Sequence, residues 1–131
     1  MQARGTFDVK LTPQKSDEGL DESLSRMTIT KQLHGGIEGT STGVMLTGGT
    51  AVQGSGVYVA LEKVTGTVGG KKGTFLMRHV GVMTRGTPSL SITVVPDSGT
   101  DELAGLEGSF DVIIEDGKHS YVFDYTLPGA H

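Results

Sequence analysis

Apolar and polar residues alternate with a period of two along most of the chain. The clearest run sets Tyr121, Phe123 and Tyr125 between smaller or polar neighbours, and residues 6–11 and 89–94 follow the same rule. Successive side chains of a strand point to opposite faces, so this period predicts strands with two distinguishable faces rather than helices. The abundant Thr and Val residues also suit strands.

Glycine-containing dipeptides separate the alternating runs. Gly35-Gly36, Gly48-Gly49, Gly69-Gly70 and Asp116-Gly117 are typical of tight hairpin turns, which need positive φ. We therefore predict eight strands, at residues 3–11, 25–34, 36–47, 56–66, 73–84, 88–95, 108–115 and 118–127. Residues 13–23 are predicted to form a polar loop. In the connection 96–107, Thr100 is predicted to cap one helical turn.

Eight strands joined by short hairpins predict an all-β fold. The arrangement we expect is a closed antiparallel barrel that forms one domain over residues 1–131, because closure removes unpaired strand edges. A two-sheet sandwich is the alternative. At eight strands, the interior of a barrel is either filled by side chains or holds one small ligand.

Composition narrows the function classes. The 131 residues include no Cys, which excludes disulfides and Cys-ligated zinc. A net charge of -4 without a basic cluster argues against a nucleic-acid partner. No run of 18 apolar residues is present, so we expect no membrane partner. The N-terminus lacks an apolar leader segment, which favours a cytoplasmic protein.

Two titratable residues are predicted to face the interior from neighbouring strands. In strand 56–66, Tyr58 and Glu62 share one face and Lys63 lies on the other. An unpaired lysine is costly in an interior, so Tyr58 and Glu62 are expected to point inward. By the same argument His79 points inward and Arg78 outward.

A hairpin turn at residues 69–72 predicts a register in which paired positions sum to about 141. Glu62 then lies directly opposite His79, and Tyr58 opposite Met83. A carboxylate beside an imidazole is a general-base couple, in which the carboxylate fixes the tautomer of the ring. We therefore take Glu62 and His79 as candidate catalytic residues.

Further interior residues complete the predicted site. Glu38 is a third candidate catalytic residue, on a strand face that it shares with Thr40, Thr42 and Val44. The expected ligand-binding residues are Tyr58, Phe75, Met77, Met83, Tyr121, Phe123, Tyr125 and Thr40.

Three interpretations of the Glu62–His79 pair stay open. It is a buried structural pair that fixes register, a polar anchor for a ligand, or the base of an isomerase or cyclase. His34, His79, Glu38 and Glu62 also have the ligand types of a divalent metal site. The His-x-His spacing of cupin metal sites is missing, however, and we expect no metal and no cofactor.

The inward orientation of Glu62 has a consequence for the outer surface. Val57, Val59 and Leu61 must then point outward together, and an exposed apolar strip is unusual for a monomer. We expect a homodimer that covers it, the alternative being cover by residues 1–24. The acidic run 17–22 is interpreted as a solvated loop, with a lid over the barrel mouth as one role for it.

Residues 57–75, with His79 and Gly81, resemble the signature of DUF3224, a family of small bacterial proteins of unknown function. Residues 95–108 resemble its second signature, although Asp101 stands where the family usually has Gly. Thr30-Lys31, Gly39-Thr40 and residues 121–125 also fit, so the resemblance covers nearly the whole chain. It implies a closed barrel similar to allene oxide cyclase, with a weaker likeness to dirigent barrels, but not their chemistry.

The sequence therefore predicts a barrel that binds, or acts on, a small and largely apolar molecule in its lumen. A cofactor-free isomerase or cyclase that uses the interior Glu and His is one alternative. A structural or interaction barrel with a filled core is the other.

Overall fold

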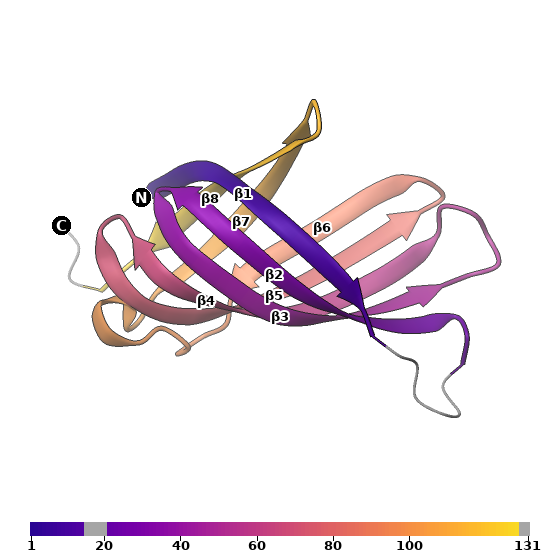
Figure 1. The fold of residues 1–131 in the computed structure, drawn as a ribbon, viewed down its shortest axis with the longest axis horizontal. Helices are drawn as coiled ribbons and strands as arrows, with labels where there is room; N and C mark the ends of the chain where they lie inside the picture. Colours follow the sequence, from indigo (N-terminus) through magenta and orange to yellow (C-terminus); the bar gives the residue numbers. More distant parts are fainter. Residues whose placement is uncertain (15–20, 129–131) are drawn as a thin grey trace.

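Each alternating run of the sequence forms a strand in the computed structural model, which describes residues 1–14 and 21–128 (Figure 1). The strands lie within two residues of the predicted bounds at each end. They are β1 (Gln2–Pro13), β2 (Leu24–Gly35), β3 (Ile37–Gly49), β4 (Gly56–Val68), β5 (Lys71–Thr84), β6 (Thr87–Val94), β7 (Glu107–Glu115) and β8 (Lys118–Thr126).

The strands pair in chain order, and β8 pairs with β1, which confirms the closed antiparallel barrel. One register differs from the prediction. Ala60 pairs with His79 and Glu62 with Met77, so the expected pairing of Glu62 with His79 is wrong by two residues. The expected pairing of position 58 with 83 is wrong for the same reason, since position 58 pairs with Gly81.

The cause of this shift is the length of the β4–β5 turn. Gly69 and Gly70 form a two-residue turn with φ of 57° and 85°, so that Val68 already pairs with Lys71. Such a turn requires positive φ, which glycine adopts without a steric penalty. A shift of two residues leaves every side chain on its predicted face, because the side-chain period is also two.

The barrel is closed more completely at one end than at the other. β1 pairs with β8 over Gln2–Thr6, and β6 pairs with β7 only through Thr93 and Ser109. Beyond these pairs the β7–β8 hairpin diverges from β6, as Figure 1 shows. We call the half near the β2–β3 and β4–β5 turns the closed half, and the half near the β3–β4 and β5–β6 turns the open half.

Aromatic side chains fill the closed half. Phe123 is 0 % exposed and stacks on Phe75 at 5.9 Å and on Tyr125 at 5.2 Å between ring centroids. Phe110 stacks on Tyr121 at 5.1 Å. These residues come from β5, β7 and β8, so their contacts join strands that are far apart in the sequence.

The Tyr121 hydroxyl ties β8 to the β2–β3 turn. It accepts a hydrogen bond from the Ile37 N–H at 2.8 Å and donates to the His34 carbonyl at 2.8 Å. A Cβ at Gly5 would lie 2.6 Å from the hydroxyl oxygen, so only glycine leaves it room there.

The β6–β7 connection closes this end and substitutes for a strand beside β5. The Leu76 N–H donates to Ser98 Oγ at 3.0 Å, the Thr74 N–H to Thr100 Oγ1 at 2.9 Å, and the Lys72 N–H to Glu102 Oε1 at 3.1 Å. Ser98, Thr100 and Glu102 therefore accept hydrogen bonds from every second residue of β5, as a paired strand would.

The predicted helical turn is a 3-10 turn, η1 (Asp101–Leu103). Thr100 is its N-cap residue, as predicted, but the Thr100 hydroxyl bonds to β5 and makes no cap hydrogen bond. The turn inserts Leu103 and Leu106 into the core, where both are fully buried.

Candidate functional site

Glu62 and His79 both face the barrel interior, as the sequence predicted. Glu62 is 0 % exposed and His79 is 5 % exposed. They lie diagonally across the β4–β5 pair, since Ala60 is the direct partner of His79. Even so, His79 Nε2 lies 2.8 Å from Glu62 Oε1, within hydrogen-bond distance.

Glu38 and Thr40 do not share that interior. Both are exposed on the outer face of β3, and Glu38 Oε1 accepts a hydrogen bond from the Gly35 N–H at 2.8 Å. The predicted inward orientation of these two residues is wrong. The inner positions in the middle of β3 are taken by small residues, Gly39, Ser41 and Gly43, because a Cβ at either glycine would lie within 2.4 Å of a backbone carbonyl oxygen of β4.

A lysine and a serine complete the buried polar cluster. Lys31 Nζ on β2 lies 3.1 Å from both carboxylate oxygens of Glu62, and the Ser41 hydroxyl donates to Oε2. The Lys31 ammonium also lies 5.0 Å from the ring centroid of Phe7, a cation–π contact. Glu62 therefore accepts hydrogen bonds from three side chains on three different strands.

The environment of Glu62 determines its charge. Burial by itself raises the pKa of Glu62, but the hydrogen bond from His79, the Lys31 ammonium and the Ser41 hydroxyl outweigh it and hold the pKa at about 2. A carboxylate held this far below neutral pH is a weak proton acceptor. Its chemical role is thus to hold Lys31 and to orient His79.

Sequence reasoning missed Lys31 and Ser41. The signal was present, because Lys31 lies between Ile29 and Leu33 on the apolar face of its strand. A lysine in such a position needs a buried counter-charge, and Glu62 is the inward-facing carboxylate that provides it.

The predicted ligand-binding residues lie in both halves of the barrel. Phe75, Met77, Tyr121, Phe123 and Tyr125 are buried in the core cluster, where they pack against one another. Tyr58 and Met83 instead line a pocket in the open half.

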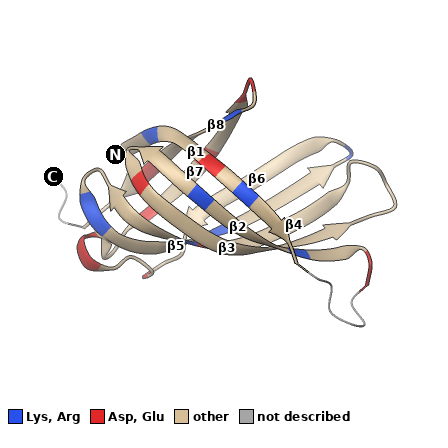
Figure 2. Ribbon diagram, viewed as in Figure 1, with Lys and Arg blue, Asp and Glu red and all other residues tan. Residues whose placement is uncertain are grey.

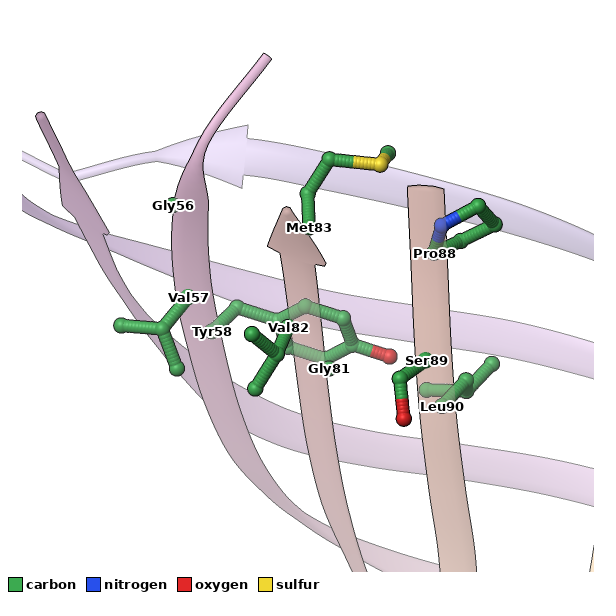
Figure 3. A pocket seen from close by; sticks show the side chains of 9 residues that line it. All are labelled: Gly56, Val57, Tyr58, Gly81, Val82, Met83, Pro88, Ser89 and Leu90. Atoms are coloured by element: carbon green, nitrogen blue, oxygen red, sulfur yellow. The ribbon is translucent and has the colours of Figure 1, made fainter. Parts of the chain in front are cut away.

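This pocket has a volume of about 220 Å³ and lies at the ends of β4, β5 and β6. Figure 3 shows the Tyr58 side chain extending across Gly81 toward Leu90. A Cβ at Gly81 would lie 2.1 Å from Cε1 of Tyr58, so the glycine provides the space for this ring. The lining residues are Gly56, Val57, Tyr58, Gly81, Val82, Met83, Pro88, Ser89 and Leu90.

The part of the open half around this pocket is poor in charge. The sequence has no charged residue between Gly39 and Leu61, and in Figure 2 the strand ends near the β3–β4 and β5–β6 turns are almost entirely uncoloured. Burial and then the charge of Glu62 raise the pKa of the Tyr58 hydroxyl, so that it stays protonated at neutral pH. A pocket of this kind favours an apolar occupant.

The candidate metal ligands are separated. His34 is exposed on the outside, 3.6 Å from Asp8, while Glu62 and His79 are inside. In the described part of the chain no three His, Cys, Asp or Glu side chains gather in a metal-binding group. No helix within residues 1–14 and 21–128 is long and apolar enough to cross a membrane. Most of the acidic run predicted as a loop or lid, residues 17–20, lies outside the described residues.

Fold and site together define an eight-stranded antiparallel barrel with a buried Lys–Glu–His cluster between a filled half and an open half. The family model for a protein of unknown function, DUF3224, matches residues 3–125, and the chain belongs to this family. Comparison with curated proteins gave no match.

A solved structure supports the same assignment. The crystal structure of a DUF3224 protein with unknown function from Shewanella oneidensis MR-1 is 42% identical in sequence, with a TM-score of 0.92. The alignment covers 99% of this chain and 98% of that one. The predicted family and barrel are thus confirmed, whereas the likeness to allene oxide cyclase stays a prediction.

Proposed function

We propose that this protein binds a small, largely apolar molecule in the open half of the barrel. The observation that supports this proposal is the exposure of apolar side chains that belong to the inner face. Leu90 shares that face with Ile92 and Val94, yet it is 46 % exposed. Leu11, Met83 and Ile114, on the inner faces of three other strands, are also exposed. A ligand in the pocket that covers Met83 and Leu90 removes apolar surface from water.

A neutral fluorescent probe, N-phenyl-1-naphthylamine, tests the proposal. We expect saturable binding with blue-shifted emission. Leu90→Asp places a charge on the inner face and should weaken binding at least tenfold. Ser91→Asp, on the outer face of the same strand, is the matched control and should leave binding unchanged. Absent or non-saturable binding, or equal effects of the two variants, would contradict the proposal.

A cofactor-free isomerase or cyclase is the second candidate function. It is favoured by the hydrogen bond that orients the His79 ring, since Glu62 then acts on the ring and His79 itself accepts the proton. Exchange of the α-protons of 2-octanone in D₂O tests this candidate. A protein-dependent exchange rate that His79→Phe abolishes would support it, and exchange at the buffer rate would exclude it for this probe.

We also propose that the chain forms a homodimer through its outer surface. Seven aliphatic side chains, each between 36 % and 57 % exposed, form one outer apolar patch over β3, β4 and β5: Val44, Leu46, Val57, Val59, Leu61, Val80 and Val82. Leu46, Val59 and Val80 are direct cross-strand neighbours at its centre.

A second copy fits this patch because its seven side chains are all uncharged, while the charged residues of the same outer face, Lys63 and Arg78, lie at its edge beside Leu61. Thr42 and Ser91 border the patch on the same outer face, and a stable interface buries roughly 800 Å² per partner. Light scattering should give twice 13.7 kDa. Val59→Lys should give the monomer mass, whereas Thr40→Lys, outside the patch, should not. A monomer mass for the unmodified protein at micromolar concentration would exclude the dimer.

A further inference from the structure

The two ring nitrogens of His79 have different partners. Nε2 lies 2.8 Å from Glu62 Oε1. Glu62 is ionised at neutral pH, and an ionised carboxylate only accepts hydrogen bonds, so Nε2 carries the hydrogen. In the neutral imidazole, Nδ1 is then an acceptor with a free lone pair.

Nδ1 has no hydrogen-bond partner among the described residues. Every fully enclosed side-chain nitrogen or oxygen atom of these residues has a partner, so Nδ1 is not fully enclosed. Nδ1 is therefore reached from the barrel interior. On the inner face of β4, Glu62 and Tyr58 flank the position opposite His79, toward the closed and the open half respectively. The ring centroids of Tyr58 and His79 are 6.3 Å apart. His79 does not itself line the pocket, but Tyr58 and Gly81 do, and both are next to it on the inner face of β4 and β5.

The charges of the cluster exclude a charged ligand group. Lys31 contacts both oxygens of Glu62, so its charge is already compensated. Arg85, at the β5–β6 turn, is exposed. Apart from Lys71, which is exposed at the β4–β5 turn of the closed half, only Lys31 and Glu62 carry a fixed charge among the inward-facing positions of the described strands. A ligand carboxylate would find no free cation there and would be desolvated next to Glu62, which is costly.

We infer that the ligand is an uncharged apolar molecule with a hydroxyl group, and that this hydroxyl donates a hydrogen bond to Nδ1 of His79. This inference rests on the proposed ligand-binding function. The apolar part of the molecule lies against Tyr58 and Leu90, and the hydroxyl lies at the boundary with the polar cluster. The chemical class is therefore an aliphatic or aromatic alcohol rather than a fatty acid or an amine.

Three probes of matched size test the inference: 1-octanol, its isomer methyl heptyl ether, and octanoate. An ether accepts hydrogen bonds but cannot donate one, so the ratio of alcohol to ether affinity reports on the acceptor in the protein. We expect calorimetry to show octanol binding about tenfold more tightly than the ether, the size of one hydrogen bond made in a dry site, and octanoate binding most weakly.

His79→Phe removes the acceptor and should bring the alcohol-to-ether ratio close to one. Ser91→Ala, on the outer face of β6 and outside the pocket lining, is the control and should leave the ratio unchanged. If His79→Phe does not fold, ¹⁵N NMR of the unmodified protein serves instead, with the Nδ1 resonance of His79 shifting on addition of octanol but not of the ether.

The outcomes separate the inference from the proposal on which it rests. Equal affinity for alcohol and ether, or tightest binding of octanoate, overturns the inference while ligand binding stands. An octanol preference that survives His79→Phe also overturns it. If neither these probes nor N-phenyl-1-naphthylamine binds, the proposed function itself fails, and the inference with it.

Discussion

The closed and open halves of this barrel are built from the same alternating strands, but their inward-facing side chains have different neighbours. In the closed half, Phe123 has an aromatic ring on either side and no contact with water. In the open half, Leu90 occupies an equivalent inward position but is half exposed. The extent of strand pairing causes this difference, since β6 pairs with β7 at one position only. An inward orientation therefore produces a core only where strands continue on every side.

The first prediction contrasts the two halves directly. Phe123→Ala removes a fully buried ring and should lower the free energy of unfolding by about 3–5 kcal/mol. Leu90→Ala, in the open half, should lower it by about 1 kcal/mol or less, because little buried surface is lost. Urea unfolding of both variants measures the two values. Similar losses would mean that the open half is packed as tightly as the closed half.

The second prediction concerns the cluster at the boundary between the halves. The pKa of Glu62 is lowered from 4.5 to about 2 in the folded protein, so its contribution to stability is complete above pH 4.5 and is lost as the pH falls through about 2. The amount at stake is on the order of 3 kcal/mol. Urea unfolding at pH 7, 4, 3 and 2 should show this decline.

Glu62→Gln should flatten the decline in the free energy of unfolding between pH 4.5 and about 2. It should also destabilise the protein at pH 7, because Lys31 is left buried without its counter-charge. Glu107→Gln, at an exposed position, is the control and should retain the wild-type profile. An unchanged acid profile in Glu62→Gln would show that other carboxylates cause the decline.

The third and smallest prediction compares two tyrosine hydroxyls. Tyr121→Phe leaves the Ile37 N–H without its acceptor in the closed half and should cost about 1–2 kcal/mol. Tyr58→Phe should change stability by less than about 0.5 kcal/mol, because the Tyr58 hydroxyl has no hydrogen-bond partner among the described residues. Thermal or urea unfolding of the two variants measures these losses of stability. A larger loss for Tyr58→Phe than for Tyr121→Phe would contradict the assignment of the two halves.

The register and the inner face of β3 show where sequence reasoning reaches its limit. The faces of β4 and β5 were predictable, because Lys63 and Arg78 each mark an outer face beside an apolar inner one. On β3 the pattern misleads, since Val44 and Leu46 are apolar but belong to the outer patch, while Ser41 and Gly43 are inside. Alternation identifies two faces, but it cannot tell an apolar outer surface from an interior.

By itself the sequence determined the eight strands, the turns at 35–36, 69–70 and 116–117, and the inward orientation of Glu62 and His79, because these follow from local alternation and from turn residues. The turn predicted at Gly48-Gly49 is wrong, since both glycines pair with β4 at the end of β3. Tertiary structure alone decided that Lys31 and Ser41 complete the cluster, and that one half of the barrel is filled while the other is open. Both depend on which residues meet across strands far apart in the chain. That pairing is set by turn lengths and by the competition for space in the interior, which no local pattern records.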